Sequence, residues 1–190
     1  MKYSKKFSVK IPKTIKIIYH IEHNLLIVIG PLGKKLYKLK LKLCLSTASN
    51  YIYVTKIKTQ ILKDNRKKAI KALRGTIVAV IKQIIVEVSS MLYKKLKFVG
   101  VGYKVFPVPL FENHLLQFKL GFSHPIFFKI PEIVKITPFR FTFIYVFGTS
   151  YYQVTQVSAN IRSHKTPEPY KGKGILYENE KIKLKVGKKV

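Results

Sequence analysis

The apolar residues of this chain twice change their spacing, from the alternation typical of strands to the three- and four-residue spacing typical of helices. The longer helical stripe consists of eight residues: Ile70, Leu73, Ile77, Val80, Ile81, Ile84, Val88 and Leu92. It predicts a helix over residues 66–91, and a second stripe predicts a helix over residues 150–162. The apolar stripe of each helix therefore has to pack against the segments that precede it in the chain.

Short strand-like segments precede each of the two stripes. In the first half they cover residues 14–19, 25–29, 36–43 and 50–55. In the second half they cover residues 97–105, 115–120, 126–130, 134–137 and 140–147. Strands followed by a helix, twice over, predict an α+β fold of two similar small domains, each an antiparallel sheet packed with one helix. We assign residues 1–93 to an N-terminal domain that ends in the long helix, and residues 94–190 to a C-terminal domain with a basic tail.

The charge of the chain restricts what it can bind. Lys and Arg number 37 and Asp and Glu number 8, so the net charge is +29. Hydrophobic residues make up 47% of the chain, which is too many for a disordered tail, so a core is expected beneath this surface. A surface so rich in lysine repels itself and favours an anionic partner, either nucleic acid or an acidic membrane surface. A small-molecule substrate is disfavoured.

Signals for catalysis, metals and cofactors are weak. The chain lacks the Gly-x-Ser-x-Gly, Walker and His-Glu-x-x-His motifs, and its few carboxylates are spread thinly. The single cysteine, Cys44, excludes an internal disulfide and a cysteine-based zinc site, and it is expected to be a buried, inert thiol. His20 and His23 have a spacing that is only a weak metal signal. We expect no catalytic residue, no metal and no cofactor.

Membrane signals are equally weak. The longest apolar stretch, residues 75–93, is interrupted by Lys82, Gln83 and Glu87. The N-terminal residues lack the apolar segment of a signal peptide. We expect no transmembrane helix.

The most promising binding segment covers residues 162–174. Its cations and its one aromatic ring are Arg162, His164, Lys165, Lys171, Lys173 and Tyr170. The cations can hold phosphates, and the tyrosine can stack on a base or hydrogen-bond to a 2′-hydroxyl. Gly172 and Gly174 would allow a phosphate backbone to come close. The alternative is an ordinary exposed loop of a basic protein.

Three further residues leave two readings open. His124 lies in a turn over residues 121–125, where it could face RNA or simply hold the turn. Gly100 and Gly102 could bring the backbone near a ligand, although packing alone would also explain them.

Three segments of the second half resemble the sixth large-subunit ribosomal protein family in its bacterial and organellar form. Residues 167–175, Pro-Glu-Pro-Tyr-Lys-Gly-Lys-Gly-Ile, resemble the C-terminal signature of that family. Residues 94–103 resemble the opening of its second domain, and residues 120–125 resemble its middle hairpin. The order and spacing of the three also match. The resemblance is specific over residues 75–180 and thin over residues 1–65.

The resemblance implies two α+β domains of like topology and a structural role in the large ribosomal subunit, without enzymatic activity. It implies binding to large-subunit rRNA near the sarcin–ricin loop, at the base of the stalk where translational GTPases dock. The C-terminal domain would make most of the rRNA contact, and neighbouring ribosomal proteins would be further partners. No membrane and no small-molecule substrate are implied.

Carried onto this chain, the family signature falls on Tyr170, Lys171, Gly172, Lys173 and Gly174. Arg162 and Lys165 stand just upstream, at positions that are typically basic in the family. Leu176 is a departure, because the family usually has a cation there, so one phosphate contact is in doubt.

Composition bears on the compartment. The 33 Lys against 4 Arg, together with heavy use of Ile, Phe and Tyr, indicate an AT-rich genome. This fits an organelle-encoded member in the mitochondrial matrix, with a plastid or a bacterial cytoplasm as alternatives. The rival functions are a non-ribosomal RNA-binding protein, a peripheral binder of acidic membranes and an enzyme acting on RNA.

Overall fold

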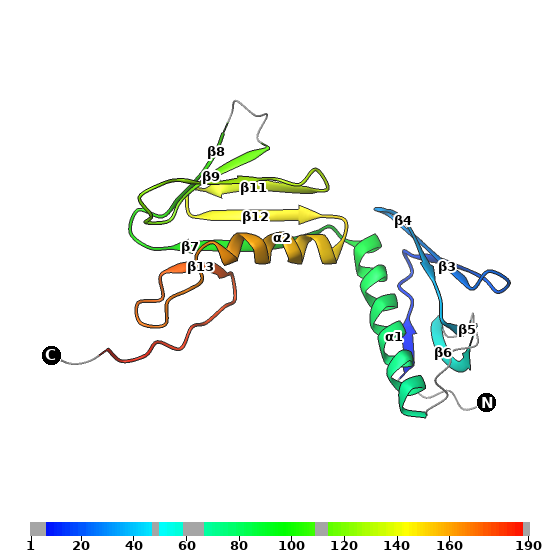
Figure 1. Ribbon diagram of the computed structural model, residues 1–190. Helices are drawn as coiled ribbons and strands as arrows, with labels where there is room; N and C mark the ends of the chain where they lie inside the picture. Colours follow the sequence, from blue (N-terminus) through cyan, green and yellow to red (C-terminus); the bar gives the residue numbers. More distant parts are fainter. Residues whose placement is uncertain (1–6, 47–49, 59–66, 109–113, 188–190) are drawn as a thin grey trace. The chain divides into compact units, whose positions relative to one another are not determined.

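The computed structural model describes residues 7–46, 50–58, 67–108 and 114–187 (Figure 1). The chain divides into two compact units, Met1–Met91 and Leu92–Val190. Each unit has its own hydrophobic core.

The first unit contains two three-stranded antiparallel sheets and one long helix. Its elements are β1 (Ser8–Lys10), β2 (Lys16–His20), β3 (Leu25–Gly30), β4 (Gly33–Lys38), β5 (Leu41–Ser46), β6 (Tyr51–Lys58) and α1 (Lys67–Ser89). The strand orders are β2-β3-β4 and β1-β6-β5. The stripe of α1, which includes Ile77, Ile81 and Val88, is buried with Leu26 and Ile52 of the strands. Removal of this apolar stripe from water is what fixes the helix in place.

One acid lies on the buried side of α1. Glu87 is 5% exposed, and it accepts hydrogen bonds from Lys35 of β4 and from Gln83, whose Nε2 is 2.9 Å from Glu87 Oε1. A buried carboxylate has to be paired in this way, because its charge is otherwise costly to remove from water.

The second unit contains a four-stranded and a three-stranded antiparallel sheet and one helix. Its elements are β7 (Leu92–Val99), β8 (Lys104–Pro107), β9 (Leu115–Lys119), β10 (Ile126–Lys129), β11 (Val134–Arg140), β12 (Phe143–Gly148), α2 (Tyr151–Ser163) and β13 (Gly174–Tyr177). The strand orders are β11-β12-β7-β13 and β10-β9-β8. Helix α2 runs along one face of the four-stranded sheet (Figure 1), and buries Val154, Val157 and Ile161 in the same core as Leu96 and Ile144.

The predicted α+β class with antiparallel sheets is confirmed, with two small sheets in each unit where one was expected. Strands β1 and β13 were not predicted. The segment 97–105, predicted as one strand, is broken by a turn between β7 and β8. Gly100 and Gly102 have φ values of 159° and 77°, and a Cβ on Gly100 would lie 2.9 Å from the Tyr103 ring. These glycines therefore serve the turn and its packing.

Three further expectations, on the thiol, on metal sites and on membrane helices, can be compared with the structure. Cys44 is partly exposed on β5, so the expected buried thiol is wrong. The alternation of the strand turns Leu41 and Leu43 to the core and Cys44 to the opposite side. No three His, Cys, Asp or Glu residues group into a metal site within the described ranges. Neither helix in those ranges combines the length and the apolar character that crossing a membrane requires.

Candidate nucleic-acid interface

Residues 164–173, which we call the basic loop, connect the end of α2 to β13. The last turn of the helix is tightened where it ends. The backbone N–H of His164 donates to Ile161 O and that of Lys165 to Arg162 O, both at 3.3 Å. The carbonyl of Lys165 then accepts a hydrogen bond from the N–H of Ile175, at 2.9 Å. The two ends of the basic loop are therefore held together by backbone hydrogen bonds.

The inner part of the basic loop is closed by two backbone hydrogen bonds of Glu168. Glu168 donates to Lys173 O, and Gly172 donates to Glu168 O, both at 2.9 Å. Gly172 has a φ of 68°, which an L side chain rarely adopts. These two bonds restrict the backbone of residues 168–173 to one shape.

Gly174 does not expose its backbone to a ligand. It is buried, and a Cβ placed on it would lie 2.6 Å from Pro167 Cα. Its missing side chain allows the start of β13 to pass directly against Pro167. This packing favours a contribution of Gly174 to the shape of the loop over a direct contact with a phosphate.

Arg162 is engaged within the protein. Its Nη2 lies 2.5 Å from Glu180 Oε1, and its Nε donates to Glu180 Oε2 at 3.2 Å. The same carboxylate accepts the N–H of Tyr177 at 3.1 Å, and the guanidinium lies 5.5 Å from the centre of the Tyr177 ring. The hydrogen bonds from Arg162 hold the pKa of Glu180 below its ordinary value. Arg162 thus secures the turn after β13, and its charge is largely compensated.

His124, predicted in the turn over residues 121–125, lies near the basic loop and is linked to it through the ring of Phe122. Lys165 Nζ lies 4.3 Å from the centre of the Phe122 ring, which is a cation–π distance. Phe122 in turn stacks on His124, with ring centres 6.0 Å apart and planes inclined by 21°. His124 is therefore close to the basic loop, although it lies 41 positions before Lys165 in the sequence.

His164 occupies a different environment from the other predicted cations. Its ring is partly buried, 6.2 Å from Phe118 and 6.0 Å from Phe128, centre to centre. It packs the start of the basic loop onto the three-stranded sheet. This places it as a positioning residue of the loop.

Of the predicted site residues in the loop, those that face outward are Tyr170, Lys171 and, partly, Lys173; Thr166, Glu168 and Pro169 are exposed beside them. Tyr170 is 53% exposed. The tail lies against this segment: Lys185 donates its backbone N–H to Pro169 O at 2.9 Å, and Leu184 Cδ2 lies 3.4 Å from the position of a Cβ on Gly172. We call the resulting set the basic surface: His124, Lys165, Tyr170, Lys171, Lys173, Lys181, Lys183 and Lys185. The three tail lysines are exposed, and the other two lysines of the tail lie outside the described residues.

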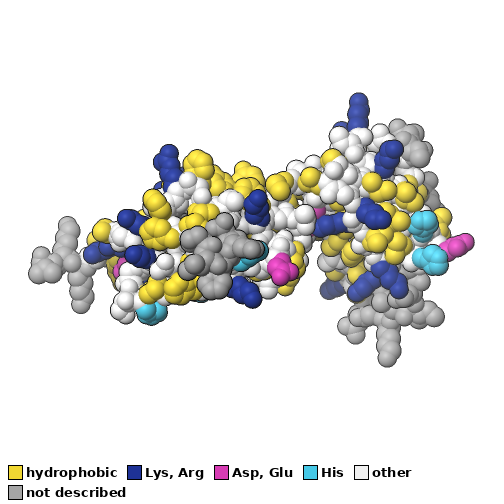
Figure 2. Space-filling view, turned by 90° about the horizontal axis from the view of Figure 1, so that it is seen from above, with side chains coloured by type: hydrophobic (Ala, Val, Ile, Leu, Met, Phe, Trp, Pro, Cys, Tyr) yellow, Lys and Arg dark blue, Asp and Glu magenta, His cyan; other side chains and the backbone are white. Residues whose placement is uncertain are grey.

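Cations are also spread over the rest of the second unit. Figure 2 shows Lys and Arg side chains distributed around it, on the left, between hydrophobic side chains and not in one cluster. Over the face that Figure 2 shows, such a distribution spreads the positive field instead of concentrating it at one point.

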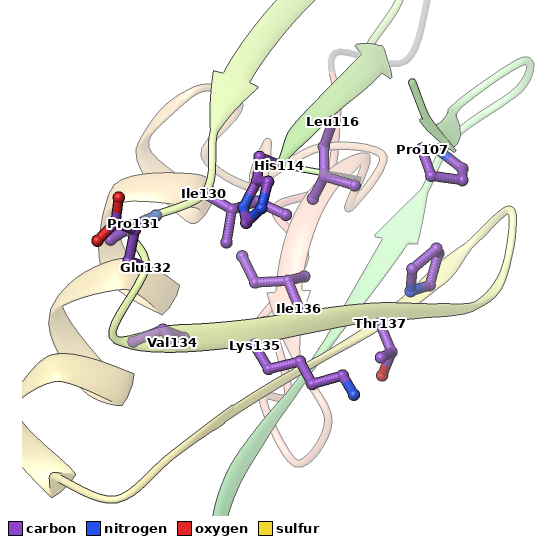
Figure 3. Close-up of a pocket in the computed structure, with 11 residues that line it drawn as sticks. Pro107, His114, Leu116, Ile130, Pro131, Glu132, Val134, Lys135, Ile136 and Thr137 are labelled. Atoms are coloured by element: carbon purple, nitrogen blue, oxygen red, sulfur yellow. The ribbon is translucent and has the colours of Figure 1, made fainter. Parts of the chain in front are cut away.

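A groove of the second unit lacks the features of an enzyme site. It has a volume of about 590 Å³ and runs along β11 (Figure 3). It is lined mainly by apolar residues, among them Leu116, Ile130 and Ile136. Its charged and imidazole groups do not converge, because Figure 3 shows Glu132 and Lys135 pointing away from His114. The arrangement supports no acid–base or nucleophilic pair.

Comparison with known proteins gives one consistent result. The family model described as Ribosomal protein L6 matches residues 99–178. The large ribosomal subunit protein uL6 of Chloroherpeton thalassium is 37% identical over 183 residues, covering 96% of this chain and 95% of the relative. The protein of the same name from Rhodospirillum rubrum is 34% identical over 184 residues, covering 97% of each. The large ribosomal subunit protein uL6c of Guillardia theta is 34% identical over 175 residues, covering 91% of this chain and 90% of the relative. The similarity therefore extends through the first unit, where the sequence motifs were thin.

Proposed function

Because the chain belongs to the ribosomal protein L6 family and is a structural constituent of the large ribosomal subunit, we propose that it binds large-subunit rRNA through the basic surface of its second unit. The resemblance noted in the sequence is confirmed by relatives that match nearly the whole chain. As a structural ribosomal protein, the chain is not an enzyme.

The observation that carries this proposal is the closed backbone of the basic loop with the tail bound against it. The Glu168–Lys173 and Gly172–Glu168 hydrogen bonds fix the segment that bears Lys171 and Lys173. The Lys185–Pro169 hydrogen bond attaches the lysines of the tail to the same segment. A segment fixed before binding loses less conformational entropy when it meets its partner, so its cations are better placed to hold phosphates.

Recognition on such a surface is by shape and charge. The major groove of A-form RNA is too deep for side chains to read, whereas its shallow minor groove presents 2′-hydroxyls between two phosphate rows. Lys171, Lys173 and the tail lysines would neutralise phosphates, and the exposed Tyr170 would contact a base or a 2′-hydroxyl. Arg162, His164 and Gly174 would act indirectly, by holding the loop in shape.

The family resemblance supports a more specific location in the subunit. We place the rRNA contact near the sarcin–ricin loop and the base of the stalk, close to where translational GTPases dock. Neighbouring ribosomal proteins would complete the surroundings of the chain. For the compartment, the lysine-rich composition supports an organellar ribosome in the mitochondrial matrix, with a plastid or a bacterial cytoplasm as alternatives.

Loss of two lysines tests the assignment of the basic surface. In the double variant Lys171→Gln and Lys173→Gln, we expect weaker binding to a large-subunit rRNA fragment. Its slope of log affinity against log salt should be shallower by about 1.4 to 1.8, since each lost phosphate contact removes about 0.7 to 0.9. The measurement is a filter-binding or fluorescence titration of the full chain at several salt concentrations.

The matched control removes two other exposed lysines of the same unit. Lys104→Gln together with Lys129→Gln changes the net charge equally, on β8 and β10. Its slope should stay close to that of the unchanged chain. Equal effects of the two double variants would contradict the assignment, because binding would then follow total charge alone.

A further inference from the structure

The four-stranded sheet of the second unit has a second face, opposite the one that α2 covers (Figure 1). Alternation along the strands turns Leu96, Ile144 and Val146 toward the helix and their neighbours to the other side. The side chains of this other face on the three strands are Tyr93, Lys95 and Lys97 of β7, Phe143, Tyr145 and Phe147 of β12, and Lys135, Thr137 and Phe139 of β11. We call it the aromatic–basic face.

The aromatic rings of this face are in mutual contact. The centre of the Tyr145 ring lies 6.1 Å from that of Tyr93, 5.9 Å from that of Phe147 and 6.1 Å from that of Phe139. Tyr93 and Phe147 are 6.2 Å apart. Tyr93 remains 58% exposed and Phe139 70% exposed. Tyr145 and Phe147 are half-buried between them, and a contiguous apolar patch on a protein surface often marks a binding site.

Cations lie among these rings in a regular way. Across the strands, Phe147 pairs with Lys135 on one side and with Tyr93 on the other. Lys95 Nζ lies 5.1 Å from the centre of the Phe143 ring, and Lys97 Nζ lies 5.9 Å from it. None of the residues of β7, β11 and β12 is acidic; Glu178, beyond β13, pairs with Lys95 at 2.7 Å.

This composition distinguishes between classes of partner. An apolar protein segment could pack on the rings, but it would also bury the ammonium groups between them. Burial of a charge without an opposite charge costs free energy. A single-stranded nucleic acid satisfies both components, since its bases stack on aromatic rings and its phosphates pair with lysines. A double helix cannot use the rings, because its bases are already stacked on one another.

We propose that the aromatic–basic face binds an unpaired segment of rRNA, with bases stacked on Tyr93 and Phe139 and phosphates held by Lys97 and Lys135. The inference rests on the proposed rRNA binding. It adds a second contact, made by other residues than those of the basic surface and with a different part of the RNA structure.

The test compares two labelled oligomers of about 12 nucleotides, a length within the usual site sizes for single strands. One is a single-stranded RNA of mixed sequence, and the other is an abasic strand with the same number of phosphates. We expect the full chain to bind the RNA at least about fivefold more tightly than the abasic strand, because stacking adds to the charge term. Tyr93→Ala should reduce this preference, because one of the two proposed stacking rings is lost. Tyr152→Ala is the control, since Tyr152 is 65% exposed on α2 and lies outside the face.

Circular dichroism first establishes that both variants fold like the unchanged chain. Equal affinity of the full chain for the two oligomers, or an undiminished preference in Tyr93→Ala, would overturn the inference and would favour a protein partner for this face. The proposed role of the basic surface would still stand after either result, provided that the Lys171 and Lys173 double variant weakens binding to the rRNA fragment. A chain that binds neither the fragment nor the oligomers would overturn the proposed function as well.

Discussion

Raising the salt concentration from 50 to 200 mM should weaken binding of the full chain to a large-subunit rRNA fragment by about 250- to 1,000-fold. The basic surface contains six lysines that can each neutralise a phosphate: Lys165, Lys171, Lys173, Lys181, Lys183 and Lys185. At about 0.7 to 0.9 per contact, six contacts give a log–log slope of about −4 to −5. Contacts made by the lysines of the first unit would steepen it further.

A melting curve at each salt concentration serves as the control for this titration, since the slope is meaningful only if the fold persists throughout. A slope between 0 and about −2 would contradict the proposal, because at most two or three phosphate contacts would then be involved.

The substitution Gly174→Ala should destabilise the second unit by about 2–6 kcal/mol. The added methyl group would lie 2.6 Å from Pro167 Cα and 2.8 Å from Pro167 N, which are backbone atoms and cannot rotate away. Overpacking of this kind costs about 1–3 kcal/mol. The φ of 151° at Gly174 adds strain for an L side chain, of the order of 1–3 kcal/mol. Because β13 pairs with β7 through Gly174 and Ile175, the damage reaches the four-stranded sheet.

Thermal unfolding followed by circular dichroism measures this effect, and hydrogen exchange of the β7 and β13 amides assigns it to the second unit. The melting temperature of that unit should fall by more than about 10 °C. Gly187→Ala is the matched control: a Cβ there meets no atom of the described chain within 4 Å, so the change should stay within about 0.5 kcal/mol. An unchanged melting temperature in Gly174→Ala would show that the basic loop can shift freely and is not held by this packing.

Helices and the interior of the fold could be predicted from the sequence because their signal is local. The apolar spacing predicted helices over 66–91 and 150–162, and the structure has Lys67–Ser89 and Tyr151–Ser163. A stripe at helical spacing is contained in one short window, so no knowledge of distant partners is needed.

Strand β13 could not be predicted in this way. It is four residues long, begins with a glycine and follows a segment with two prolines and another glycine, which favour irregular structure. Its partner, β7, lies 75 positions earlier, from Gly174 to Val99. Ile175 and Leu176 are buried, so the residue that departs from the family signature is covered by the protein itself.

The residue types of the candidate site could be predicted from the sequence, but the contacts that each residue makes could not. The cations, Tyr170 and the glycines were evident from the sequence. Three contacts were not evident from it: the Arg162–Glu180 ion pair, the packing of His164 on Phe118 and the contact of Lys165 with Phe122. Each joins residues 18 or more positions apart, and no local pattern shows which acid or ring a given cation will meet. The aromatic–basic face was missed for the same reason, because it forms only when β7, β11 and β12 lie side by side.

The most direct test of the central claim is sucrose-gradient sedimentation of a native lysate, with the chain detected by antibody at low and at moderately high salt. A constituent of the large ribosomal subunit migrates with that subunit and stays with it at moderate salt, because many contacts act together in the assembled particle. Migration as a free small protein, or with membranes, at both salt concentrations would contradict the account.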